Sequence, residues 1–149
     1  MTTAPTTAAL PPAPTGPPPA AVLTGRRPGK EILTVTARPV PPSAVVIAAR
    51  GEVDLCTSPL LRESLLAHLR PPCSGLVIDL TDVGFLGAAG LTVLTTAGDA
   101  ATAAGIKLCV VAHSRPVLRP LTITGLDRVF DLHPDLPQAL RCLGGGPAG

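Results

Sequence analysis

The stretch LVIDLTDVGFLGAAGLTVLTTAGDAATAAG, residues 76–105, decides the fold. Residues 76–80 form a short and nearly continuous apolar run, which is typical of a strand that is covered on both faces of a sheet. Residues 81–86 lead out of this strand, and residues 88–104 carry apolar side chains at helical spacing. Gly105 suits the position that ends a helix. The stretch therefore predicts a buried strand, a tight junction and a helix.

The chain before this stretch predicts two further strands and a helix. Residues 32–36 alternate weakly and indicate a first strand at an edge of the sheet, followed by a proline-rich loop from Pro39. Residues 44–49 (AVVIAA) indicate a second buried strand. A helix then follows, with Ser58 as its predicted N-cap, and Pro71 stops it.

The chain after the stretch continues to alternate strands with helices. Residues 106–112 predict a core strand, and residues 115–124 predict a short helix that Ser114 caps. Residues 129–130 suggest a brief last strand, and residues 135–143 a last helix.

The predicted order ββαβαβαβα indicates a single α/β domain with a mixed, mostly parallel central sheet and about four helices. We expect this domain over residues 31–143. Residues 1–30 are rich in Pro, Thr and Ala and predict a disordered arm, because such a segment buries too little apolar surface to offset its ordering entropy. Residues 144–149 predict a Gly-rich flexible tail.

Composition excludes several classes of function. The net charge is only +2, with 12 basic and 10 acidic residues, and there is no Trp or Tyr. A nucleic-acid partner is therefore not expected, since single-strand binders use a basic groove and stacking rings. We also expect no signal peptide and no membrane insertion, because prolines interrupt the early apolar runs and no run is long enough to span a bilayer. The expected location is the cytoplasm.

The reactive residue types show no catalytic or metal-binding pattern along the chain. The 4 cysteines form no CxxC pair, and none of the 3 histidines lies at ligand spacing from a cysteine. We therefore expect no metal, no cofactor and no catalytic residue, and we read the cysteines as reduced, buried side chains. The Gly-rich segment 87–90 is not a Walker loop, since no GK[ST] follows it.

Three segments carry a family resemblance. GEVD at residues 51–54, followed by Thr57, resembles the first signature of STAS domains. VIDLTDVGFLGAAGL at residues 77–91 resembles their second signature, V-[LI]-D-L-[ST]-x-V-x-F-[LIM]-D-S-[SA]-G-L. TGLDRVF at residues 124–130 is similar to the turn near their C-terminal end. The chain thus resembles the anti-sigma factor antagonists, which are regulatory modules and not enzymes.

The resemblance implies a phosphorylation switch, and this chain departs from it. In such proteins a partner anti-sigma factor, a histidine-kinase-like ATPase, phosphorylates a Ser that begins the helix after the central strand, and the added charge ejects the partner. Ala88 stands at the position matching that Ser, and Gly87 at the position of the preceding Asp. Alanine has no hydroxyl, so we expect no phosphorylation there; Thr92, one turn further on, is the nearest alternative acceptor.

The expected function is to bind an anti-sigma factor and release a sigma factor. The alternative is a cytoplasmic accessory subunit of a membrane transporter, and a nucleotide hydrolase is a third reading that lacks a base, nucleophile or metal cluster. The residues expected to contact the partner are Glu52, Asp54, Thr57, Gly87, Ala88, Ala89, Gly90 and Thr92. Two structural interpretations stay open: the Asp54 side chain could form hydrogen bonds with the backbone of its own loop, and Asp79 could form a structural hydrogen bond or ion pair within the sheet.

Overall fold

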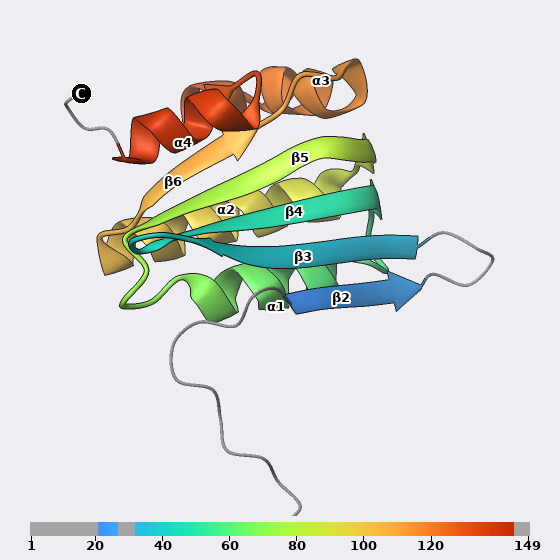
Figure 1. Cartoon of the computed structure of the whole chain (residues 1–149). Helices are drawn as coiled ribbons and strands as arrows, with labels where there is room; N and C mark the ends of the chain where they lie inside the picture. The colour runs from blue at the N-terminus through green and yellow to red at the C-terminus, as the bar shows by residue number, and fades with distance from the viewer. Residues whose placement is uncertain (1–20, 27–31, 145–149) are drawn as a thin grey trace, which may run out of the picture.

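The computed structural model describes residues 21–26 and 32–144, with side chains from residue 33 to residue 143. These residues form one six-stranded sheet, in the order β2-β3-β4-β5-β6-β7, with four α-helices packed against it (Figure 1). The strands are β2 (Ala21–Arg26), β3 (Ile32–Val40), β4 (Ala44–Val53), β5 (Gly75–Leu86), β6 (Lys107–Val111) and β7 (Asp131–His133). The helices are α1 (Ser58–His68), α2 (Ala88–Ala104), α3 (Arg115–Thr124) and α4 (Leu136–Gly144), and a 3-10 turn, η1 (Leu126–Arg128), follows α3.

The direction of the strands confirms the predicted α/β class. β2, β3 and β4 pair antiparallel, whereas β4, β5, β6 and β7 pair parallel. Parallel neighbours need a crossover connection, which α1, α2 and α3 supply in turn. The sheet is therefore mixed and mostly parallel.

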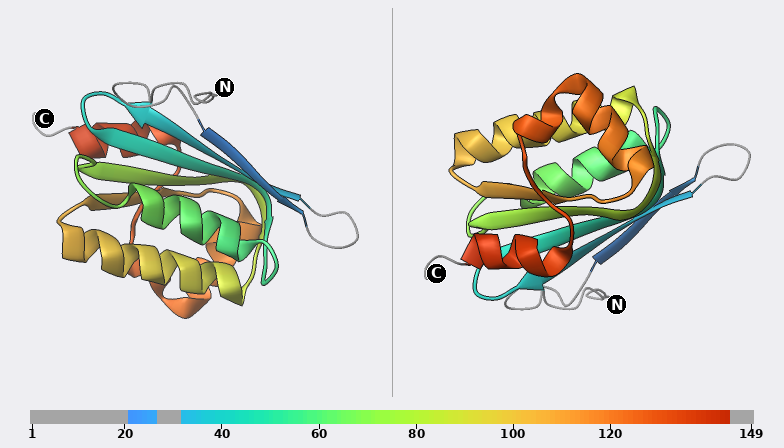
Figure 2. Two further views of the ribbon diagram at one scale, coloured as in Figure 1. Left: turned by 90° about the horizontal axis from the view of Figure 1, so that it is seen from below. Right: turned by 90° about the horizontal axis from the view of Figure 1, so that it is seen from above.

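The helices form a layer on each face of the sheet. Figure 2 shows α1, α2 and α3 on one face and α4 on the other. Neighbouring strand residues point to opposite faces, so Ile78 packs into the larger core with Leu65 and Leu94, whereas Val77 packs into a smaller core with Ala139 of α4. Within the described residues, no helix is both long and apolar enough to cross a bilayer.

The N-terminal side of the domain differs from the prediction. Residues 21–26, expected in the disordered arm, form β2, which pairs antiparallel with β3 from Ala21↔Ala37 to Arg26↔Ile32. The first predicted strand is thus not at the edge. The reason lies in the sequence, because residues 20–27 contain no proline and can supply every backbone donor that a ladder needs. The rest of the arm, residues 1–20 and 27–30, and residues 145–149 of the tail lie outside the described residues.

Several predicted boundaries were also wrong. The last strand is β7, not residues 129–130, because the Phe130 side chain is buried against α2 while Val129 is exposed. The N-cap of α1 is Thr57, not Ser58, and β3 continues through Pro39, which pairs with Val45. Ser114 occupies the N-cap position of α3 as predicted, yet its hydroxyl makes no capping hydrogen bond.

β4 and β5 both run further than predicted and end together. Their final pairs are Glu52↔Phe85 and Val53↔Leu86, after register shifts between Ala48 and Arg50 and between Gly51 and Glu52. Gly51 has a φ of 121°, which side chains with a Cβ rarely adopt, so glycine allows the ladder to continue past the irregularity. The loops that follow the two strands therefore begin at the same edge of the sheet.

Candidate functional site

The predicted partner-contact residues gather where β4 and β5 end. The Gly87 N–H donates to the Val53 carbonyl at 2.9 Å, which ties the β5–α2 junction to the end of β4. All eight predicted residues lie at the end of β4, in these two junctions or in the first two turns of α2. The structure thus brings together two segments that are more than thirty residues apart in the sequence.

The loop after β4 is held by its own polar groups. Asp54 Oδ1 accepts hydrogen bonds from the backbone N–H groups of Cys56, at 2.9 Å, and Thr57, at 3.0 Å. The Thr57 hydroxyl donates to the Glu52 carbonyl at 2.7 Å, and its oxygen accepts from the Asp54 N–H at 3.0 Å. Thr57 is only 2% exposed, so its side chain shapes the loop and offers no surface to a partner.

Close packing explains the two glycines of the junction before α2. A Cβ on Gly90 would lie 2.6 Å from Leu86 Cδ1 and 2.7 Å from Val53 Cγ1. A Cβ on Gly87 would lie 3.0 Å from Cε2 of Phe85. The glycines therefore let the start of α2 lie close against the ends of β4 and β5.

Ala88 is the first residue of α2, and it is exposed. The first turn of a helix has backbone N–H groups without helical partners and carries a partial positive charge. No acidic residue of α2 lies in that turn. Thr92, one turn further along, is also exposed, and its hydroxyl donates to the Ala88 carbonyl at 3.1 Å.

Two apolar residues at this edge were missed from the sequence. Leu55 is 80% exposed and Phe85 is 48% exposed, and the ring of Phe85 lies beside Gly87. Aromatic side chains such as Phe are enriched in the cores of protein interfaces. The available signal was that Phe85, one of only two phenylalanines, lies two residues before Gly87.

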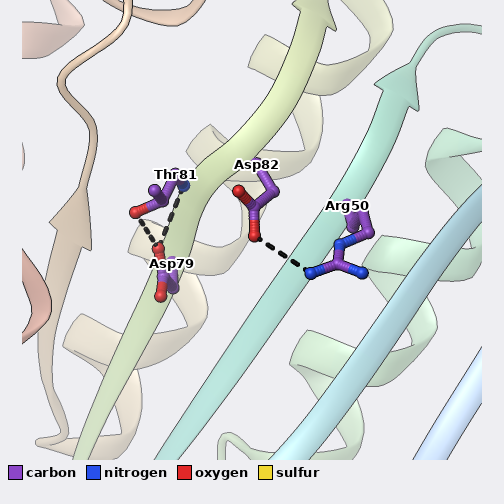
Figure 3. A network of polar contacts seen from close by, with 4 residues as sticks. All are labelled: Arg50, Asp79, Thr81 and Asp82. Carbon is purple, nitrogen blue, oxygen red and sulfur yellow. Dashed lines mark hydrogen bonds and ion pairs between the residues drawn. The ribbon is translucent and has the colours of Figure 1, made fainter.

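Asp79 and its neighbours make structural contacts along β4 and β5 (Figure 3). Asp79 Oδ1 accepts hydrogen bonds from the Thr81 N–H at 3.0 Å and from the Thr81 hydroxyl at 2.6 Å. Arg50 and Asp82 form an exposed ion pair, with Nη2 and Oδ2 3.5 Å apart. These contacts support the structural reading of Asp79, and an exposed ion pair of this kind adds little stability.

The described residues also contain one group that could hold a metal ion. Sequence spacing predicted no metal site, yet the structure brings together Cys109, Asp131, His133 and Cys142. Spacing along the chain does not reveal this group, because Cys109, Asp131 and His133 meet through the pairing of β6 with β7 and Cys142 is added by the packing of α4.

Comparisons with known proteins find chains of similar sequence. A family model described as STAS domain matches residues 36–139. The anti-sigma-F factor antagonist RsfB of Mycobacterium tuberculosis is 36% identical over 101 residues, which is 68% of this chain and 82% of that protein.

Solved structures with a similar fold are also found. The crystal structure of an anti-sigma factor antagonist from Mycobacterium paratuberculosis has a TM-score of 0.71 and 31% sequence identity, covering 80% of this chain and 99% of that one. The anti-sigma factor antagonist SpoIIAA in its unphosphorylated form has a TM-score of 0.62 over 72% of this chain and 93% of that one. At 15% identity, the second similarity shows the shared fold alone.

Proposed function

Because this chain belongs to the STAS domain family, we propose that it is an anti-sigma factor antagonist, a non-catalytic module that binds an anti-sigma factor and so frees a sigma factor. The observation that carries the proposal is the 36% identity to RsfB, which extends over 82% of that protein. Following the resemblance in the sequence, the proposed partner is an anti-sigma factor of the histidine-kinase-like ATPase type, and the proposed location is the cytoplasm.

The proposed contact surface, which we name the docking edge, consists of the accessible residues at the ends of β4 and β5 and on the first turns of α2. Its members are Glu52, Asp54, Leu55, Phe85, Gly87, Ala88, Ala89 and Thr92. Phe85 is an exposed aromatic side chain, a type that is enriched in the cores of interfaces, and Leu55 adds exposed apolar area to the same edge. Thr57 and Gly90 are buried, and they support the docking edge from beneath.

We propose that phosphorylation does not control this docking edge at the usual position. The signature at residues 77–91 aligns Ala88 with the phosphoacceptor Ser, and a methyl group cannot accept a phosphoryl group. Ala88 is exposed at a helix N-terminus, where a phosphate would interact favourably with the backbone N–H groups. The backbone at position 88 could therefore bind a phosphate, but the side chain has no hydroxyl to carry one. This supports the proposal that the protein stays in the state that binds its partner.

Calorimetric titration of the chain into each histidine-kinase-like anti-sigma factor of the same organism tests this proposal. We expect micromolar or tighter binding to one of them, and we expect incubation with ATP to leave that binding unchanged. Ala88→Ser should bind equally well at first and lose binding as ATP is consumed. Ala88→Asp should bind about tenfold to a hundredfold more weakly, because it places an unpaired charge in the interface.

A matched control is available on the same helix. Asp at position 88 suits a helix N-terminus and should leave the fold intact. Ala103→Asp places the same charge on an exposed residue about 22 Å along the helix axis, and binding should not change. Equal binding by the wild type and Ala88→Asp would exclude the start of α2 from the interface, and absence of binding to every candidate would refute the antagonist function.

A further inference from the structure

Four side chains with metal-ligating atoms meet on the face of the sheet that α4 covers. Cys109 of β6 pairs with Asp131 of β7, and Val111 pairs with His133. Residues two apart on a strand point to the same face, so Cys109, Asp131 and His133 share one face. α4 packs on that face and brings Cys142 to the other three.

The distances are close to those that a metal ion requires. One ligand atom from each residue can be chosen so that all four lie within 4.8 Å of one another. Asp131 Oδ2 is 3.1 Å from Cys142 Sγ and 3.7 Å from Cys109 Sγ, and Asp131 Oδ1 is 3.5 Å from His133 Nε2. Tetrahedral zinc, with bonds of about 2.0–2.3 Å, holds its ligand atoms about 3.3–3.8 Å apart, so shifts of about 1 Å would close the cluster around an ion.

Without a metal ion, the thiols of Cys109 and Cys142 keep their protons and donate hydrogen bonds to the carboxylate of Asp131. The carboxylate of Asp131 accepts from the thiol of Cys142, and this hydrogen bond lowers the pKa of Asp131. Burial, followed by the nearby Cys142 and Asp131, raises the pKa of Cys109 to about 12. His133 Nε2 is buried and makes no hydrogen bond. A divalent cation would replace the thiol protons and bind this nitrogen, which now has only the 3.5 Å contact with Asp131 Oδ1 given above.

Charge and ligand chemistry favour zinc. Two thiolates and a carboxylate around a divalent ion leave a net charge of −1, and Lys107 Nζ lies 3.9 Å from Asp131 Oδ2, where it offsets that charge. Thiolate and imidazole ligands suit zinc, whereas magnesium and calcium prefer oxygen ligands. Four protein ligands complete a tetrahedral shell, which is the pattern of structural zinc sites and not of catalytic ones.

We infer that Cys109, Asp131, His133 and Cys142 form a structural zinc site that fastens α4 to β6 and β7. α4 otherwise covers its face of the sheet through a small apolar cluster around Val77 and Ala139. The zinc site lies at the β6–β7 side of the sheet, whereas the docking edge is formed by β4, β5 and α2. The metal would therefore stabilise the domain without belonging to the docking edge.

Zinc titration of the reduced, metal-free chain against a chromophoric chelator tests this site. We expect one tight zinc ion per chain, bands of tetrahedral thiolate coordination when cobalt replaces zinc, and a higher Tm with zinc. Cys142→Ser and His133→Ala should each weaken binding at least about a hundredfold.

Cys56→Ser is the matched control, because Cys56 is an exposed thiol outside the cluster. Its zinc affinity and zinc-induced rise in Tm should equal those of the wild type. Circular dichroism of the metal-free variants checks that each is folded before titration. Weak or non-saturating binding, binding that Cys142→Ser and His133→Ala leave unchanged, or a Cys109–Cys142 disulfide without zinc affinity in the reduced chain would each overturn the assignment.

Discussion

Gly90→Ala should destabilise the domain even though alanine is the better helix former. The added Cβ would lie 2.6 Å from Leu86 Cδ1 and 2.7 Å from Val53 Cγ1, so both side chains would have to move by about 1 Å to regain ordinary contact distances of about 3.5–4.0 Å. Leu86 is 3% exposed and Val53 is fully buried. Both side chains are packed in the core, and the β-branched Val53 is stiff at χ1.

The magnitude follows from two opposing effects. Overpacking a filled core costs about 1–3 kcal/mol, and two displaced side chains put this site near the upper end of that range. Replacing Gly by Ala in a helix contributes at most about 1 kcal/mol of stability in return. We therefore expect the free energy of unfolding to fall by about 1–2 kcal/mol, with Tm lower by about 4–12 °C.

Urea unfolding of three variants measures this effect. Gly84→Ala is the control, because nothing lies within 4 Å of its Cβ position, and it should be neutral or slightly stabilising. The added Cβ of Gly98→Ala would meet only the ring of Phe130, at 3.0 Å, so the stability of this variant should lie between those of the other two. If Gly90→Ala proved as stable as Gly84→Ala, the close approach of α2 to β4 and β5 would not be a packing constraint, and our account of the junction would be wrong.

Three further predictions concern single side chains. Phe85→Ala should weaken partner binding by about 1–3 kcal/mol, measured by calorimetry, while Tm stays nearly unchanged because the ring is half exposed; an unaltered affinity would remove Phe85 from the docking edge. Asp54→Ala removes an acceptor of two backbone N–H groups, so urea unfolding should show a loss of about 1–2 kcal/mol, and no loss would mean that the loop is held otherwise. The pKa of Asp131 is lowered from 3.8, so the contribution of its carboxylate to the free energy of unfolding is present above about pH 4 and is lost as the pH falls further. With a chelator present to remove metal ions, Asp131→Asn should lose less stability than the wild type between pH 5 and 3. Parallel curves of stability against pH for the two proteins would contradict this.

Much of the fold could be predicted because local signals and tertiary packing agree. α2 begins and ends where the sequence predicts, between Gly87 and the left-handed Gly105, since a regular apolar stripe and a glycine stop both indicate the same helix. β7 was misplaced because it has only three residues and depends on pairing with β6, which no local pattern reports. β2 was missed because the surrounding prolines dominate the composition of its segment.

The docking edge and the metal-ligating cluster show what spacing along the chain leaves out. The motifs indicated the backbone of both junctions, but the exposure of Leu55 and the burial of Thr57 depend on how the β4–α1 loop folds onto Asp54. The cluster depends on the pairing of Cys109 with Asp131 and on the face that α4 covers. Such contacts arise from tertiary structure, so only the assembled sheet reveals them.

The most direct test of the central claim is release of a sigma factor from a preformed complex with its anti-sigma factor. The chain is added with ATP present, and free sigma factor is measured by size-exclusion chromatography or by restored transcription from a sigma-dependent promoter. We predict stoichiometric release that persists as ATP is consumed, whereas Ala88→Ser releases the sigma factor only transiently. A chain that leaves the complex intact at saturating concentration would contradict the antagonist function.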